Sequence, residues 1–163
     1  MHVMTATEEV RSDMEAFTFA GTDRRPVVGL TNGCFDLLHP GHVLMLEDCA
    51  RRCDLLIVAI DDDDAVRALK GPRCPWRPFV DRARVVAALR SVWRVLPITD
   101  GQSLGDIMKI LRPDFYFCRG DEQVPEMTDA MRLRIPIVAL PRHGDWSTRK
   151  ETSQWRRDLH SSR

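Results

Sequence analysis

The sequence predicts a single α/β domain with a mainly parallel sheet of about five strands and helices on both faces. Short apolar segments alternate along the chain with segments of helical periodicity, which is the pattern of such folds. The run 54–60 is almost continuously apolar, as is typical of a parallel strand covered on both sides. A chain of 163 residues is long enough to bury a proper core. We expect residues 26–163 to form this domain.

The first 25 residues are polar and show only weak periodicity in Val10, Met14 and Phe17. This segment is interpreted either as a flexible N-terminal tail over 1–25 or as a loosely docked helix. Both interpretations stay open at this stage.

The first strand is expected over 27–31, a short apolar and β-branched run that Asn32-Gly33 interrupts. A helix follows over 41–52, where apolar residues recur at helical spacing. The second strand is the run 54–60, and four aspartates come directly after it. Carboxylates at Asp61 to Asp64 could attract magnesium, but a solvated loop is the commoner meaning of such a run.

The second half of the chain repeats the alternation. A helix is expected over 81–92 with Asp81 as its N-cap, followed by a strand over 95–98 that Pro97 makes short or places at an edge. The remaining expected elements are a helix over 104–111 stopped by Arg112-Pro113, a strand over 115–118, a helix over 125–134, a strand over 135–140 and a last helix from Ser147 or Thr148 towards Leu159.

Composition excludes several classes of function. The 24 basic and 24 acidic side chains cancel, which argues against a nucleic-acid-binding coat. No apolar run approaches the ~20 residues that span a bilayer, and the acidic N-terminus does not resemble a signal peptide. We therefore expect a cytoplasmic protein without nucleic-acid or membrane partners. The five cysteines form no C-x-x-C pair and are interpreted as free, buried thiols.

The strongest chemical signal is the segment 33–42, G-C-F-D-L-L-H-P-G-H, between the first strand and the first helix. Ligands of open parallel sheets bind at this place, beyond the carboxyl ends of strands. Gly33 allows backbone to approach a phosphate, and the amide of Cys34 can point at it. His39 and His42 lie three residues apart at a helix N-terminus that favours anions. Two imidazoles beside free amides suit the charge stabilisation that transfer at an α-phosphate needs.

This segment resembles the H-x-G-H nucleotidyltransferases, a Rossmann-like group that includes cytidylyltransferases and heptose-phosphate adenylyltransferases. The resemblance extends from about Val27 to about Ser153 and implies that His39 and His42 contact the triphosphate. The stretch L-K-G-P-R-C-P from Leu69 is similar to the L-K-G-x-x-R-P stretch of the heptose-phosphate enzymes, which implies that Lys70 meets a phosphate.

Further positions are carried over from the same resemblance. Arg142, Ser147 and Thr148 match the R-T-x-G-I-S-T signature of glycerol-phosphate cytidylyltransferases and imply a β/γ-phosphate clamp, although the two hydroxyl residues are also ordinary N-caps. Arg82 matches a family arginine near a phosphate, or it is an exposed first-turn residue. The full set of implied nucleotide-binding residues is Thr31, Asn32, Gly33, Cys34, Phe35, Arg82, Gly120, Asp121, Arg142, Ser147 and Thr148.

Two departures from the signature point to the acceptor. Trp146 stands where the family has a small aliphatic residue, and Arg149 where it has a threonine. Together with Asp36 they are the candidate acceptor-binding residues.

The resemblance thus implies transfer of a nucleoside monophosphate from an NTP to a phosphorylated small molecule, with release of pyrophosphate. Mg²⁺ would accompany the NTP, mostly through phosphate oxygens, and no protein side chain is assigned to it. ATP and a sugar phosphate such as a heptose phosphate are favoured. The alternatives are CTP with glycerol-3-phosphate or a related alcohol phosphate, and a non-catalytic nucleotide-binding module. A homodimer stays open.

Overall fold

The computed structural model describes residues 7–19, 23–120 and 125–146. Its strands are β1 (Val28–Gly33), β2 (Leu55–Asp61), β3 (Arg94–Ile98), β4 (Phe115–Arg119) and β5 (Ile137–Leu140). Its helices are α1 (Thr7–Ala16), α2 (Pro40–Ala50), α3 (Asp63–Lys70), α4 (Phe79–Ala87), α5 (Leu104–Leu111) and α6 (Pro125–Arg132). The fold class is confirmed, since all strand pairs are parallel and the five strands form one sheet.

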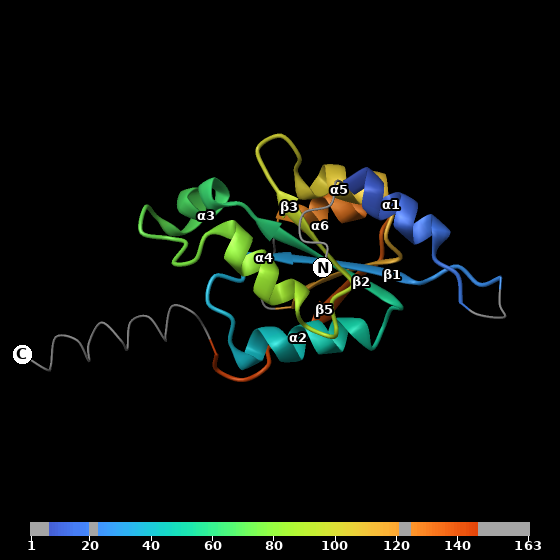
Figure 1. The fold of residues 1–163 in the computed structure, drawn as a ribbon, viewed down its shortest axis with the longest axis horizontal. Coiled ribbons are helices and arrows are strands. Elements are labelled where there is room, and N and C mark those ends of the chain that lie inside the picture. Colours follow the sequence, from blue (N-terminus) through green and yellow to red (C-terminus); the bar gives the residue numbers. More distant parts are fainter. Residues whose placement is uncertain (1–6, 20–22, 121–124, 147–163) are drawn as a thin grey trace, which may run out of the picture.

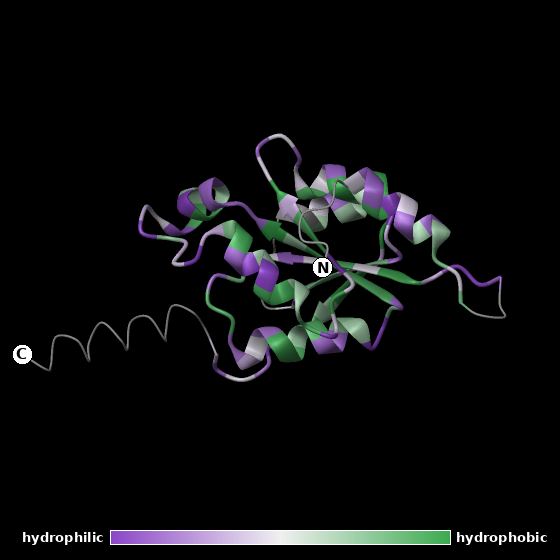
Figure 2. Ribbon diagram, viewed as in Figure 1, coloured by the Kyte–Doolittle hydropathy of each residue, from purple (hydrophilic) through white to green (hydrophobic). Residues whose placement is uncertain are grey.

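The sheet separates two layers of helices. Helices α1, α5 and α6 lie on one side of it and α2 and α4 on the other, as Figure 1 shows. The strands are the most apolar part of the ribbon in Figure 2. Alternate residues of β2 serve the two cores: Ile57 packs towards α5, and Leu56 and Val58 pack towards α2 and α4. Burial on both faces explains why the β2 run has no polar alternation.

The strand order is β3-β2-β1-β4-β5, with β1 at the centre. The chain builds outwards from β1 in one direction through β2 and β3, and then crosses to the other side for β4 and β5. The carboxyl ends of β1 and β4 therefore flank the point where the strand order reverses, which is where open α/β sheets bind ligands. Edge strand β3 contains Pro97, as the sequence predicts.

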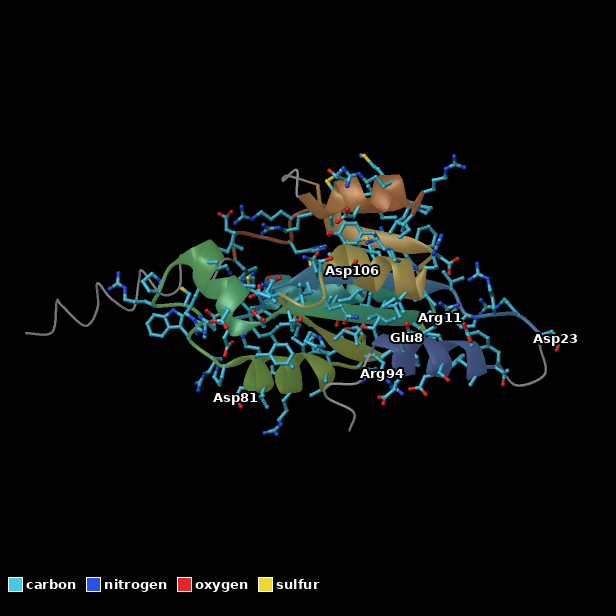
Figure 3. The ribbon with its side chains drawn as sticks, turned by 90° about the horizontal axis from the view of Figure 1, so that it is seen from above. Glu8, Arg11, Asp23, Asp81, Arg94 and Asp106 are labelled. Atoms are coloured by element: carbon cyan, nitrogen blue, oxygen red, sulfur yellow. The ribbon has the colours of Figure 1, made fainter. Side chains whose placement is uncertain are left out.

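The N-terminal segment is a docked helix over Thr7–Ala16 rather than a tail. The side chain of Val10 is fully buried in the core beside α5, and the hydroxyl of Thr7 donates to Gln102 at 2.8 Å. Figure 3 shows Arg94 of β3 beside α1, where its guanidinium lies 3.3 Å from the carboxylate of Asp13. The three weakly periodic residues Val10, Met14 and Phe17 all pack on this core, which docks the helix.

Several boundaries and one element differ from the sequence expectations. Strand β1 continues through Gly33, because Asn32 and Gly33 still pair with β2. Helix α4 begins at Phe79 with Pro78 as its N-cap, so Asp81 is not the cap. Helix α3 is absent from the prediction and occupies much of the expected aspartate loop. The expected last helix from residue 147 lies outside the described residues. Within the described part of the chain, no helix is long and apolar enough to span a bilayer.

Candidate active site

The motif loop leaves β1 at Gly33 and enters α2 at Pro40, beside the end of β4. Two of the expected nucleotide-binding side chains at the end of β1 are used inside the protein. The hydroxyl of Thr31 is buried and donates to the carbonyl of Phe117 at 3.0 Å, and Asn32 Oδ1 accepts from the hydroxyl of Tyr116 at 2.7 Å. The side chains of Thr31 and Asn32 therefore tie β1 to β4, and nucleotide binding at these two positions stays a prediction.

The two motif histidines form a stacked pair at the start of α2. Their ring centroids are 3.7 Å apart with 17° between the planes. The backbone N–H of His39, the N-cap residue, donates to Nδ1 of His42 at 3.4 Å. A Cβ on Gly41 would lie 3.2 Å from both the His39 ring and the carbonyl oxygen of His143, so any larger residue would require these neighbours to shift by a few tenths of an ångström.

Burial and nearby cations keep His42 neutral. Burial lowers the pKa of His42 to about 3, and the charges of His39, Lys70 and Arg119 act in the same direction. Because Nδ1 accepts a hydrogen bond, the proton of the neutral ring is on Nε2. His42 can thus donate a hydrogen bond without carrying a charge. The same effect shows that Lys70 of α3 and Arg119 of β4 are close to the histidine pair.

Arg119 begins the segment Arg119-Gly120-Asp121, which resembles the family's G-D loop, but the sequence analysis placed only Gly120 and Asp121 in the binding set. Arg119 is exposed at the carboxyl end of β4, next to Gly120, whose amide donates to the carbonyl of Leu140. Its position becomes meaningful only with the strand order, which places β4 beside β1. The next motif residue, Asp121, lies outside the described residues.

The residues that follow Gly33 shape the floor of the site. The Cys34 thiol donates to Asp61 Oδ2 at 3.1 Å, and burial with this carboxylate raises the pKa of the thiol to about 11, although Lys70 acts to lower it. Phe35 has the left-handed φ of 46°, and its ring centroid lies 5.2 Å from that of His42. The backbone thus turns sharply at Phe35, beneath the histidine pair.

Asp36, a candidate acceptor-binding residue, has a structural task in the protein. Its side chain is 4% exposed, and Oδ1 accepts hydrogen bonds from the backbone amides of Trp76 and Arg77 at 2.8 and 3.1 Å. The carboxylate therefore holds the segment between α3 and α4 against the motif loop. Contact of Asp36 with the acceptor stays a prediction.

Arg82 is neither an exposed residue nor a direct phosphate ligand. Its side chain is 0% exposed, and the guanidinium donates to three backbone carbonyls and to the carboxylate of Asp63. With these donors engaged inside the protein, no face of Arg82 is open to a nucleotide. The interpretation of Arg82 as an exposed first-turn residue is therefore wrong, and its position near a phosphate stays a prediction.

The aspartate run connects the end of β2 at Asp61 directly to the start of α3 at Asp63, so it is not a solvated loop. Asp62 is the N-cap and its side chain accepts from the amide of Ala65 at 2.8 Å. Asp63 pairs with Arg82, whereas Asp64 pairs with Arg67 on the surface. Among the described residues, no three histidine, cysteine, aspartate or glutamate side chains converge as a metal site.

The segment after β5 carries Arg142 and is docked on α2. Arg142 is exposed, and the neighbouring His143 places Nε2 at 2.9 Å from the carboxylate of Asp48. Trp146 is 47% exposed. Ser147, Thr148 and Arg149 lie outside the described residues, so their expected contacts with phosphate and acceptor stay predictions.

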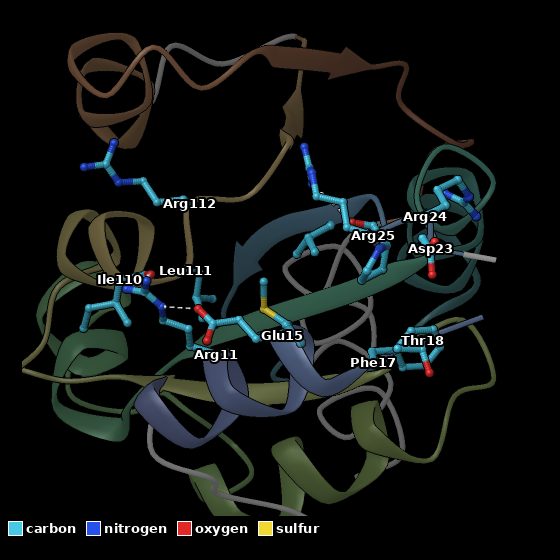
Figure 4. A pocket seen from close by; sticks show the side chains of 13 residues that line it. Arg11, Glu15, Phe17, Thr18, Asp23, Arg24, Arg25, Ile110, Leu111 and Arg112 are labelled. Atoms are coloured by element: carbon cyan, nitrogen blue, oxygen red, sulfur yellow. Dashed lines mark hydrogen bonds and ion pairs between the residues drawn. The ribbon is translucent and has the colours of Figure 1, made fainter. Parts of the chain in front are cut away.

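A cavity of about 470 Å³ lies at the opposite end of the sheet from the histidines. Figure 4 shows its lining by α1, the end of α5 and the segment before β1. Three of its arginines are already paired: Arg11 with Glu15, Arg24 with Asp54 and Arg25 with Asp114. We therefore place the candidate active site at the motif loop and not in this cavity.

The model of the cytidylyltransferase-like family matches residues 30–160. "Bifunctional protein HldE" of Gluconacetobacter diazotrophicus is 51% identical over 107 residues, which cover 66% of this chain and 22% of that protein. The protein of the same name from Granulibacter bethesdensis is 47% identical over 94 residues, covering 58% and 19%. The matched region therefore spans about a fifth of the length of these relatives.

Solved structures agree in fold. A lipopolysaccharide core biosynthesis protein from Thermoplasma volcanium aligns with a TM-score of 0.65 at 20% identity, covering 72% of this chain and 98% of that one. Pantothenate synthetase from Thermus thermophilus aligns with a TM-score of 0.58 at 14% identity, covering 86% and 62%. At these identities the likeness concerns the fold alone.

Proposed function

The chain belongs to the cytidylyltransferase-like family, and on this premise we propose that it transfers a nucleoside monophosphate from an NTP to a phosphorylated small molecule. An oxygen of the acceptor's phosphate attacks the α-phosphorus of the NTP and forms the new P–O bond. The bond between the α-phosphorus and the oxygen bridging to the β-phosphate breaks, and pyrophosphate leaves. The products are a nucleoside-diphosphate-linked acceptor and pyrophosphate.

The observation that carries this proposal is the stacked pair of His39 and His42 at the switch point of the sheet, with Lys70 and Arg119 beside it. Two imidazoles at the N-terminus of α2 are thus combined with the charges of Lys70 and Arg119, which act on His42. Such a preorganised set stabilises charge on a phosphorus in the transition state without any covalent nucleophile.

Each residue has a distinct task in this mechanism. His42 is neutral and offers its Nε2–H to an oxygen of the α-phosphate, and His39 lies against it within the same stack. Lys70 and Arg119 bring positive charge to the phosphates from the ends of α3 and β4. Arg142 is the proposed clamp for the distal phosphates. Mg²⁺ enters with the triphosphate, neutralises it and is held chiefly by phosphate oxygens and water.

For the substrates we propose ATP and a sugar phosphate such as a heptose phosphate. The L-K-G stretch that ends α3 supports this choice, and so does the similarity to the two relatives described above, at 51% and 47% identity. The arginine after β5 supports a second candidate, CTP with glycerol-3-phosphate or a related alcohol phosphate, because it belongs to the signature that resembles the glycerol-phosphate enzymes.

Pyrophosphate release with each of the four NTPs and a panel of sugar and alcohol phosphates tests the proposal. Release with ATP and a heptose phosphate is the expected result, and release with CTP and an alcohol phosphate would favour the second candidate. Tight NTP binding without pyrophosphate release for any pair would instead indicate a non-catalytic nucleotide-binding module.

A further inference from the structure

We propose that Arg82 is a positioning residue, which fixes the helix that ends at Lys70 against the motif loop at Cys34. The kinetic test of this inference rests on the proposed function, because kcat/KM can be measured only if the chain is a transferase. The affinity for ATP tests the inference without that condition. Arg82 itself touches no substrate, since its side chain is fully buried.

The guanidinium joins four separate segments. Its Nη1 donates to the carbonyl of Cys34 at 2.5 Å, and its Nε donates to the carbonyl of Arg77 at 3.0 Å. Its Nη2 donates to the carbonyl of Asp61 at 2.9 Å and to Oδ1 of Asp63 at 2.7 Å. One side chain thus links the motif loop, the end of β2, the start of α3 and the segment before α4.

Asp63 is the only charged partner among these four groups. A buried guanidinium without a carboxylate is costly, so the pair holds Asp63 in place strongly. Asp63 is the first residue of α3, directly after the N-cap Asp62. The orientation of α3 at its N-terminus is therefore set by Arg82.

Helix α3 transmits that orientation to Lys70. The helix runs from Asp63 to Lys70, a distance of about 10 Å at 1.5 Å per residue, and it is stiff over two turns. Lys70 lies at its last position and is close enough to Cys34 and His42 to lower the pKa of each. A tilt of α3 about its start would move the ammonium of Lys70 relative to the histidines.

The opposite wall of the site is fixed by the same guanidinium. Arg82 holds the carbonyl of Cys34, and the next residue, Phe35, makes the left-handed turn that brings its ring against His42. The positions of Lys70 and of the motif loop thus both depend on the buried guanidinium of Arg82. Correct spacing matters because a displacement of about 1 Å at a reacting centre can cost about 10²-fold in rate.

Neighbouring aspartates of α3 supply a matched pair of variants. Asp63→Ala removes the charged partner of Arg82, whereas Asp64→Ala removes a carboxylate that is 77% exposed and pairs with the surface residue Arg67. We expect D63A to raise the Kd for ATP and to lower kcat/KM by about 10- to 100-fold. D64A should change neither by more than about two-fold.

A double mutant separates positioning from a general loss of stability. If Asp63 acts through Lys70, D63A should have almost no further effect on kcat/KM or on the Kd for ATP in a chain that already carries Lys70→Met. If the effects of D63A and K70M simply multiply, the route through Lys70 is wrong and the proposal is overturned. Should D63A fail to fold by circular dichroism, Asp63→Asn serves in the same cycle, because it removes the charge but keeps Oδ1 as an acceptor.

Failure of the proposed function would look different. If the wild-type chain releases no pyrophosphate with any substrate pair, the transferase activity is wrong, but calorimetric titration with ATP still compares wild type, D63A and D64A. Equal Kd values for all three proteins would overturn the positioning role of Arg82, and a weaker affinity in D63A alone would support it.

Discussion

The rings of His39 and His42 stack at a centroid distance of 3.7 Å, and the backbone N–H of His39 donates to Nδ1 of His42. The two histidines are three residues apart at the N-terminus of α2, and at this spacing the backbone N–H of His39 fixes the ring orientation of His42. This arrangement makes both the protonation state and the catalytic contribution of the pair testable.

The free energy of unfolding should depend on pH through His42. Its folded pKa is about 3, mainly because of burial, and its unfolded pKa is ~6.5. Between these pH values the imidazole is protonated in the unfolded chain and neutral in the folded chain. The free energy of unfolding therefore falls as the pH falls from 6.5 towards 3. From pH 7 to pH 5 the expected loss is about 2 kcal/mol. Urea denaturation at the two pH values should show this loss in wild type and a clearly smaller one in His42→Asn. An identical pH dependence in both proteins would contradict it.

Each histidine should contribute to turnover rather than to folding. His39→Ala or His42→Ala should lower kcat by roughly 10²–10³, the scale for losing one preorganised transition-state donor. The melting temperature at pH 7 should change little, since both residues are only half-buried at the mouth of a loop. Steady-state pyrophosphate release and thermal denaturation check the two statements. Unchanged turnover in both variants would remove the proposed mechanism.

The sequence predicts the frame of the fold well where local signals agree. Helix α5 occupies Leu104–Leu111 as expected, because Ser103 caps its start and Arg112-Pro113 stops it. Helix α3 escapes prediction since Val66 is its single buried residue and its start is a run of aspartates. Capping by Asp62 and the ion pairs Asp63–Arg82 and Asp64–Arg67 hold this helix, which at 8 residues is shorter than the window over which helical periodicity is detected.

The candidate site is only partly predictable for a related reason. The histidine motif is local and its residues are found directly. The role of Arg82 depends on carbonyls of Cys34 and Asp61, which lie 48 and 21 residues away in the chain. Arg119 depends on the pairing of β4 with β1. Such relations follow from strand order and packing, which no short segment of sequence encodes.

Cys34 should be replaceable by serine. Its thiol donates to Asp61 Oδ2, and a serine hydroxyl can make the same hydrogen bond. Because the pKa of the thiol is about 11, it is protonated at neutral pH and is a poor nucleophile. Cys34→Ser should keep most of the turnover, and Cys34→Ala, which removes the donor, should lose about 1–2 kcal/mol of unfolding free energy. A nucleotidyl group trapped on Cys34 would overturn direct displacement.

Lys70 and Arg142 should act on binding as well as on turnover. Both are proposed to hold phosphates that are charged in the ground state, so Lys70→Met and Arg142→Met should each raise the KM for NTP and lower kcat. Lys70→Arg should rescue only in part, because a guanidinium differs in shape and reach from an ammonium. Wild-type affinity for NTP in both neutral variants, measured by calorimetry, would show that neither residue is a clamp.

Trp146 should influence the acceptor rather than the nucleotide. It replaces a small aliphatic residue of the family signature, and its indole is 47% exposed. The ring lies over Gly144, where an added Cβ would come within 3.0 Å of it. About half of this side chain is therefore open to stack on a flat ligand face, and little apolar packing is lost when it is shortened.

We accordingly expect Trp146→Ile to change kcat/KM for the acceptor while the KM for NTP stays within about two-fold of wild type. Arg149→Thr should behave in the same way if its guanidinium meets the acceptor's phosphate. Kinetics with the acceptor and the NTP varied in turn separate the two effects, so the NTP series is the internal control. A change in kcat/KM for the acceptor alone indicates a contact with the acceptor. If W146I instead lowers the melting temperature and leaves the acceptor kinetics unaltered, the indole packs on the protein itself.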